Sequence, residues 1–176
     1  MKRLFYNIKA SIIRRKSNTE TELGKFLLRN ALKISTAESC TGGLISSRLT
    51  DVSGSSAYIR MNFVTYSNDA KMKILNVSEE TLLKYGAVSQ ECAYEMAQGL
   101  QKLTGSDIVL CTTGIAGPTG DKNKPIGLIY VAVGYKDKIE VREFNLNPHY
   151  NRKNMKFMFS ECALKMVLDI TTKYFF

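Results

Sequence analysis

Helix-forming and strand-forming segments alternate along most of this chain, and this alternation restricts the folds that it can adopt. Residue spacing and capping residues predict six helices, at residues 20–31, 43–49, 68–75, 79–85, 90–104 and 151–170. β-branched and apolar runs predict five strands, at residues 33–37, 58–66, 108–113, 127–135 and 139–144. The last two strands are joined by a hairpin-sized connection. We therefore predict an α/β fold, a three-layer α/β/α sandwich with a mixed, mostly parallel sheet.

The 176 residues suffice for one domain with its own core, and their charge is unevenly distributed. Of the net charge of +9, six basic residues and no acidic one lie within residues 1–16. We predict a basic N-terminal arm at 1–18 and a domain at 19–176. A solvated, partly frayed arm is the favoured interpretation. An amphipathic helix for a membrane, a targeting presequence and an RNA contact are the alternatives.

Cysteine and histidine usage excludes several classes of site. The four cysteines, at positions 40, 92, 111 and 162, form no Cys-x-x-Cys pair, so neither a zinc ribbon nor a redox motif is expected. Reduced thiols indicate a cytoplasmic protein. His149 is the single histidine of the chain, and we expect no metal and no cofactor.

A turn with two hydroxyl residues and two glycines follows the first predicted strand. Ser39 would be lifted from the sheet edge as a nucleophile, while Thr41, Gly42 and Gly43 lead into a helix. Free backbone N–H groups at the start of that helix would stabilise an oxyanion. The alternative is a plain strand-to-helix turn with Ser39 or Thr41 as its N-cap. Cys40 is a second possible nucleophile.

A nucleophilic serine needs a base, and with so few histidines the best candidate is a lysine. Lys71 lies one turn into a helix that follows the strand ending near Tyr66, and Asn68 starts this helix. A lysine base must lose about three units from its usual pKa of ~10.4, which requires a dry pocket. The alternatives are that Lys71 is an ordinary solvated residue or that Lys73 takes the role.

A glycine-rich loop follows the strand at 108–113. Thr113, Gly114, Ile115, Ala116 and Gly117 open it, and their backbone N–H groups could approach a phosphate or carboxylate. A wide turn without a ligand is the alternative. Because ligands of such folds gather at the carboxyl ends of strands, this loop and the two turns are expected to converge on one edge.

Five segments together, in order and spacing, resemble the CinA C-terminal domain family. They are residues 37–43, residues 64–68 with 70–71, and residues 86–89, 113–118 and 124–127. The similarity runs from about residue 20 to residue 173. The family's characterised members are nicotinamide mononucleotide amidases that use a serine–lysine mechanism, and its longer members carry an additional N-terminal domain.

The resemblance implies a role for each matching residue. Ser39 falls on the family nucleophile, Lys71 on its general base and Tyr66 on a tyrosine that assists the pair. Thr113 and residues 114–117 match a substrate-binding segment. The substrate-binding set that we predict also contains Thr41, Gly42, Gly43, Asn68 and Arg152. A small-molecule nucleotide substrate and a homodimer are expected as partners.

The region before the last helix departs from the family pattern. The family commonly has a Gly-Asp-Arg triplet there, whereas this chain has Leu146-Asn147-Pro148. If the missing arginine binds the substrate phosphate, Arg152 or His149 is the candidate replacement. A second hypothesis follows from this departure and from the basic arm. It is a catalytically degenerate accessory protein in DNA uptake or repair that binds a nucleotide or nucleic acid, with salt-sensitive binding through residues 1–16.

Overall fold

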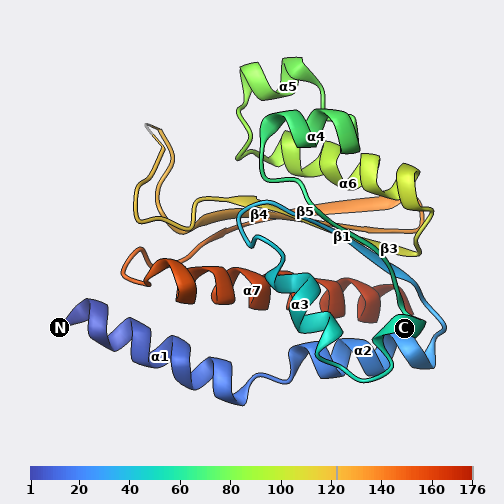
Figure 1. Cartoon of the computed structure of the whole chain (residues 1–176), viewed down its shortest axis with the longest axis horizontal. Helices are drawn as coiled ribbons and strands as arrows, with labels where there is room; N and C mark the ends of the chain where they lie inside the picture. The colour runs from blue at the N-terminus through green and yellow to red at the C-terminus, as the bar shows by residue number, and fades with distance from the viewer. Residues whose placement is uncertain (122, 176) are drawn as a thin grey trace.

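The computed structural model describes residues 1–121 and 123–175, and its centre is one five-stranded sheet (Figure 1). The strands are β1 (Ile34–Glu38), β2 (Ile59–Val64), β3 (Ile108–Gly114), β4 (Leu128–Tyr135) and β5 (Lys138–Asn145). Their order across the sheet is β2-β1-β3-β4-β5. β1 pairs in parallel with β2 and β3, whereas β4 is antiparallel to both β3 and β5. The mixed sheet is confirmed, but it is not mostly parallel, because two of its pairings are parallel and two are antiparallel. The parallel pairings occupy the half that carries the candidate site.

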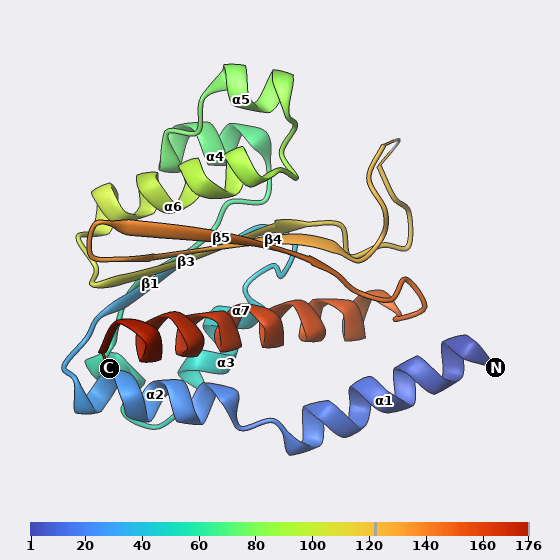
Figure 2. The same ribbon diagram turned by 180° about the vertical axis from the view of Figure 1, so that it is seen from behind.

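Helices cover both faces of the sheet, which confirms the three-layer sandwich (Figures 1 and 2). On one face lie α4 (Asn68–Leu75), α5 (Glu79–Lys84) and α6 (Gln90–Thr104). On the other face lie α1 (Lys2–Lys16), α2 (Thr19–Arg29), α3 (Leu44–Thr50) and α7 (Arg152–Phe175). A short 3₁₀ helix, at Ser55–Ala57, precedes β2. Every predicted helix and strand is present, with bounds that differ by a few residues.

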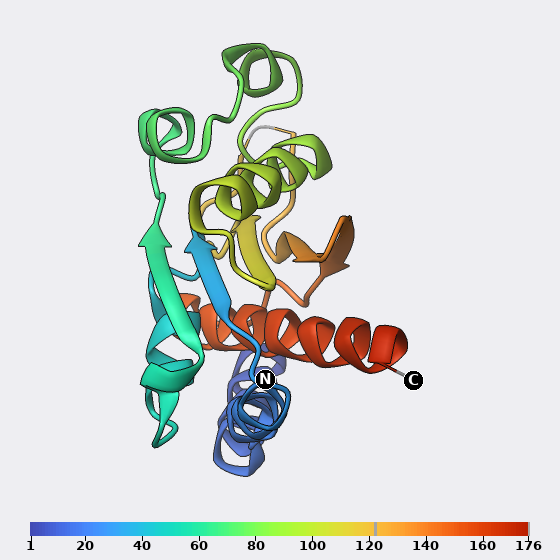
Figure 3. The same ribbon diagram turned by 90° about the vertical axis from the view of Figure 1, so that its right-hand side faces the viewer.

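Each face of the sheet has its own apolar core. Between the sheet and α7 the buried side chains of the last helix include Met155, Phe159 and Ala163, and on the opposite face α6 contributes Met96 and Leu100. Viewed from the side, α6 and α7 lie on opposite faces of the twisted strands (Figure 3). The helical spacing of these apolar residues places each set on one face of its helix.

The close approach of α4 to α6 depends on a glycine. An added Cβ at Gly99 would lie 1.8 Å from the backbone oxygen of Leu75, the last residue of α4. No side chain fits in that space, so Gly99 allows the two helix backbones to touch. Because α4 also carries Lys71, this contact contributes to the position of the candidate base.

Residues 2–16 form helix α1, which packs along α7, so the expectation of a frayed arm is wrong, although most of its residues are exposed as expected. Ala10 is fully buried in this contact. Leu4, Phe5, Ile8 and Ile12 are exposed, each by half or more of its surface. Ala10 and the partly buried Tyr6 pack against the apolar core, and this tertiary contact stabilises the helix despite its charge. Within the described residues, no helix has the length and apolarity to cross a membrane.

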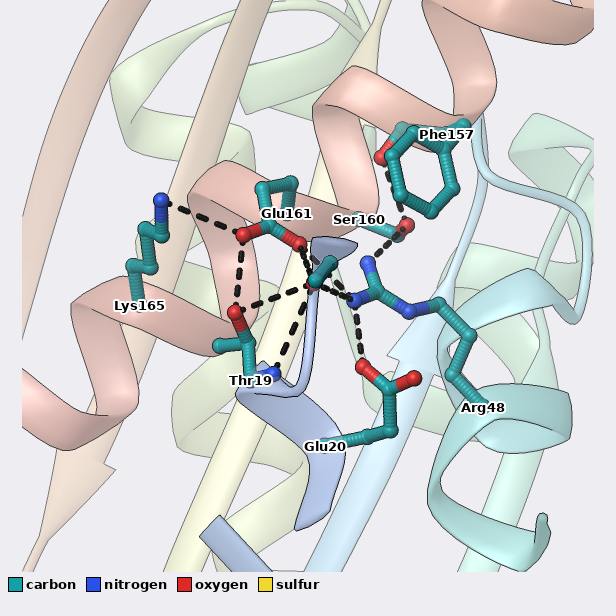
Figure 4. Close-up of polar contacts among 8 residues, drawn as sticks. Thr19, Glu20, Arg48, Phe157, Ser160, Glu161 and Lys165 are labelled. Carbon is teal, nitrogen blue, oxygen red and sulfur yellow. Dashed lines mark hydrogen bonds and ion pairs between the residues drawn. The ribbon is translucent and has the colours of Figure 1, made fainter. Parts of the chain in front are cut away.

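A buried polar cluster joins α3 and α7 to the segment between α1 and α2 (Figure 4). The Arg48 guanidinium donates to Glu161 Oε2 at 2.8 Å and to Glu20 Oε2 at 2.5 Å, and also to the hydroxyls of Ser17 and Ser160. The side chains of Arg48 and Glu161 are each only 5% exposed. Since a buried charge is tolerated only when it is paired, the cluster specifies how these helices pack.

Candidate active site

Ser39 lies immediately after β1 in a turn that its glycines permit. Gly42 and Gly43 have φ values of 59° and 88°, a region that residues with a Cβ rarely adopt. The Ser39 backbone N–H donates to Thr112 O of β3 at 3.0 Å, which fixes the turn against the neighbouring strand. The side chain is 8% exposed and borders a cavity.

Lys71 reaches the same point from helix α4. The hydroxyl of Ser67 caps this helix by accepting from the Ala70 N–H at 3.1 Å. The Lys71 side chain is 1% exposed, and its Nζ lies 3.1 Å from Ser39 Oγ. The two side chains, thirty-two residues apart in sequence, therefore meet within hydrogen-bond distance in a water-poor position.

Burial lowers the pKa of Lys71 below its ordinary value, because the charged form loses its hydration. Its amine also donates to Thr65 O at 2.9 Å and to Tyr66 O at 3.3 Å. A neutral amine has two N–H donors and one lone pair. With both donors engaged by these carbonyl oxygens, the lone pair can accept the proton of the Ser39 hydroxyl.

Lys73 does not compete for this role. Its side chain is 74% exposed and pairs with Asp69 at 3.0 Å on the outer face of α4. Cys40 is equally unsuited to be the nucleophile, because burial raises the pKa of its thiol to about 12. A thiol with such a pKa is almost wholly protonated near neutral pH and is a poor nucleophile.

The expected oxyanion donors at the start of α3 are already engaged. The buried Glu38 carboxylate accepts from Ile45 N at 3.0 Å and from Ser46 N at 2.8 Å. The last side chain of β1 thus caps the helix that follows the turn. Since the Ser39 N–H is also bonded within the sheet, the prediction of free N–H groups at this helix start is wrong.

The cavity beside Ser39 has a volume of about 320 Å³. Nine of the predicted site residues line it: Ser39, Tyr66, Lys71, Thr113, Gly114, Ile115, Ala116, Gly117 and Arg152. The strand ends and the glycine-rich loop do converge on one edge of the sheet, as the predicted topology requires.

Four predicted substrate-binding residues do not line this cavity. The Thr41 hydroxyl is fully buried and bonded to the Thr112 hydroxyl at 3.0 Å. Gly42 and Gly43 shape the turn, and Asn68 is exposed as the first residue of α4. These four residues shape the backbone of the turn and of the helix start. That role does not require their side chains to face the cavity.

Sequence reasoning missed one wall of the cavity, formed by Ala87 and Val88. The Thr113 hydroxyl donates to Ala87 O at 2.6 Å, and Lys124 Nζ donates to Val88 O at 2.5 Å, so this wall is attached to the loop opposite. Residues 86–89 belong to the segments that resemble the family, and this resemblance was the sequence feature that could have placed Ala87 and Val88 at the site. Cys40 and residues 119–121 complete the lining.

Arg152, the first residue of α7, supplies a cation at the cavity. Its guanidinium donates to Gly117 O and, at 3.1 Å, to the Tyr66 hydroxyl. His149, the other candidate replacement, instead lies 5.9 Å from the ring of Tyr6 on α1 and does not line the cavity. Among the described residues, no group of three His, Cys, Asp or Glu side chains could hold a metal ion.

The fold and the site define an α/β protein whose parallel strands end at a buried serine–lysine pair. A family model, the CinA C-terminal domain, matches residues 16–171. The chain belongs to this family.

Relatives and solved structures of the same family resemble the chain closely. A CinA-like protein of Chloroherpeton thalassium is 49% identical over 154 residues, which cover 86% of this chain and 37% of the relative. A CinA-like protein of Syntrophomonas wolfei is 46% identical over 142 residues, which cover 80% of this chain and 34% of the relative. The chain thus spans about a third of the length of these curated relatives.

Two crystal structures superpose over most of the chain. The competence/damage inducible protein CihA from Agrobacterium tumefaciens has a TM-score of 0.81 at 36% identity, covering 88% of this chain and 97% of its own. A CinA superfamily protein from Escherichia coli has a TM-score of 0.83 at 31% identity, and the match covers 87% of this chain and 88% of the E. coli chain.

Proposed function

We propose that this protein hydrolyses the amide of nicotinamide mononucleotide to give nicotinate mononucleotide and ammonia. The observation that carries the proposal is the 3.1 Å contact between Ser39 Oγ and the buried Lys71 amine. Such a pair supplies a nucleophile and its base without a histidine. The activity itself follows from the family resemblance.

In the first half of the reaction, Ser39 Oγ bonds to the amide carbon while its proton passes to the Lys71 amine. The tetrahedral intermediate collapses when the carbon–nitrogen bond breaks. The Lys71 ammonium returns the proton to the departing nitrogen, which leaves as ammonia. The product of this half is an ester between Ser39 and the pyridine carboxyl group.

In the second half, water replaces ammonia. The neutral Lys71 amine accepts a proton from the attacking water, and the ester carbon–oxygen bond then breaks. Ser39 recovers its proton from the Lys71 ammonium, and the product leaves as a carboxylate. Lys71 can act as both base and acid because burial holds its pKa below the ordinary range of lysine.

The position of the Arg152 cation at the cavity suggests how the substrate is oriented. In our proposal the amide lies at Ser39, and the guanidinium of Arg152 binds the phosphate at the cavity rim, where an arginine fork fits two phosphate oxygens. The Tyr66 hydroxyl accepts a hydrogen bond from Arg152 at 3.1 Å. In our proposal it therefore lies beside the bound phosphate. This assigns to Arg152 the role that the altered segment at 146–148 left open.

The test is ammonia release from nicotinamide mononucleotide by the purified chain. Ser39→Ala and Lys71→Met should each lower kcat by about a thousandfold, because the members of a catalytic pair fail together. Lys73→Met, on the exposed face of the same helix, is the matched control and should keep full activity. Full activity in either of the first two variants would remove the proposed pair. No ammonia release by the unmodified chain would favour the accessory-protein hypothesis instead.

A further inference from the structure

A second cavity, of about 490 Å³, adjoins the catalytic one. It is lined by Arg14, Leu44, Arg152, Lys153 and Lys156, and Arg152 lines both cavities. The lining residues come from α1, α3 and the start of α7, which lie on the same side of the sheet (Figure 1). The proposed amide hydrolysis uses only Arg152 of these four cations, so the other three have no assigned role.

All four basic side chains border the second cavity. On α7, Lys156 is four residues after Arg152 and three after Lys153, so its side chain neighbours both on the helix surface. The Lys156 amine lies over the turn that holds Ser39, 3.1 Å from where a Cβ on Gly42 would be. The Arg14 guanidinium stacks on Phe157, 5.4 Å from the ring centroid, which orients it from α1.

None of these four cations has an acidic partner among residues 1–121 and 123–175. Arg48, which stacks on the same Phe157 ring, is by contrast paired with two carboxylates. Unpaired charges of one sign around a hollow repel one another and attract a counter-ion of opposite sign. The cavity is therefore suited to an anion with several charged oxygens.

We propose that this basic cavity binds an anion that carries two linked phosphate groups. A single phosphate is satisfied by one arginine fork and one or two amines, whereas here Arg14 and Lys153 remain after Arg152 and Lys156 have been used. The anion is either the pyrophosphate bridge of a pyridine dinucleotide substrate or a separate polyphosphate. The first source rests on the proposed amidase function, and the second does not.

Titration calorimetry with inorganic pyrophosphate and with orthophosphate tests the site on the full chain. Pyrophosphate should bind more tightly than orthophosphate, and Arg14→Gln/Lys153→Gln should weaken pyrophosphate binding by about tenfold or more. The matched control is Arg15→Gln/Lys16→Gln, which removes the same charge from residues that do not line this cavity. It should stay within about twofold of the unmodified chain, because neither side chain borders the proposed anion site.

Ammonia-release kinetics distinguish the two sources. If the bridge of a dinucleotide occupies the cavity, Arg14→Gln/Lys153→Gln should raise KM for nicotinamide adenine dinucleotide and leave KM for the mononucleotide unchanged. If a separate polyphosphate binds, both KM values should be unchanged while calorimetry still shows weaker pyrophosphate binding.

Two results would overturn the proposal. Equal affinity for pyrophosphate and orthophosphate would refute a site for two phosphates, and equal weakening in both double variants would show only a general effect of net charge. Failure of the amidase proposal would be recognised separately, by absence of ammonia from every substrate while pyrophosphate still binds. Circular dichroism of each variant confirms that it remains folded.

Discussion

Replacing Arg48 with methionine isolates the buried ion cluster that connects α3 and α7. The substitution keeps most of the apolar stem and removes the guanidinium that contacts Glu161 at 2.8 Å and Ser160 at 2.8 Å (Figure 4). Glu161 would keep the Thr19 hydroxyl at 2.7 Å and the Lys165 amine at 3.1 Å. Its carboxylate, 5% exposed, would lose its one deeply buried counter-charge.

The size of the effect follows from the pKa of Glu161. Burial alone would raise this pKa, but hydrogen bonds from Arg48, Thr19, Ser17 and Lys165 outweigh burial and lower it from 4.5 to about 2. A difference of roughly 2.5 pH units corresponds to about 3 kcal/mol. Removing one partner of a buried pair costs about 3 to 5 kcal/mol in general. We expect Arg48→Met to lose about 3 kcal/mol, since the other donors remain.

The same reasoning fixes the sign of the pH dependence. The folded-state pKa of Glu161 lies below its unfolded value, so its contribution is fully present above pH 4.5 and is lost as the pH falls toward 2. Without Arg48 this contribution shrinks. The difference in unfolding free energy between the unmodified chain and Arg48→Met should therefore be largest near neutral pH and should decrease below pH 4.5.

Urea unfolding followed by circular dichroism, at pH 7 and at pH 3.5, measures both quantities. Lys73→Met removes an exposed pair instead and should change stability by less than about 0.5 kcal/mol. Arg48→Met/Glu161→Gln should recover part of the loss, because the more deeply buried of the two unpaired carboxylates is then absent. A loss below about 1 kcal/mol, or an equal loss at both pH values, would refute the assigned role of the cluster.

Two further predictions concern Lys71 and the helix that carries it. Because burial lowers the pKa of Lys71 below 10.5, kcat/KM should rise with pH through that lowered pKa, and a pH–rate profile without an acidic limb would contradict the assignment. Gly99→Ala should destabilise the fold by about 1 to 3 kcal/mol and lower activity, because the new Cβ meets Leu75 O and displaces α4. Unchanged urea unfolding in Gly99→Ala would show that α4 and α6 can separate without cost.

The sequence alone predicted all five strands and the six helices from α2 to α7, because their signals are local. Helical spacing in residues 90–104 and the continuous apolar run at 108–113 depend only on which face of an element becomes buried. The sequence also identified Ser39 and Lys71 as candidates, from their positions after strands and from the scarcity of histidine. Residues 1–16 were misjudged because their helix gains its stability by packing on α7, a partner that lies far along the chain.

Only the tertiary structure decided which groups meet. The 3.1 Å contact of Lys71 with Ser39, the capture of the α3 N–H groups by Glu38 and the entry of Ala87 into the cavity wall all depend on packing. Helical and strand periodicity is set within a few residues, whereas a hydrogen-bond partner is selected by the positions of separate elements. That physical difference is why the candidate residues could be identified from the chain while their donors, cavity walls and counter-charges could not.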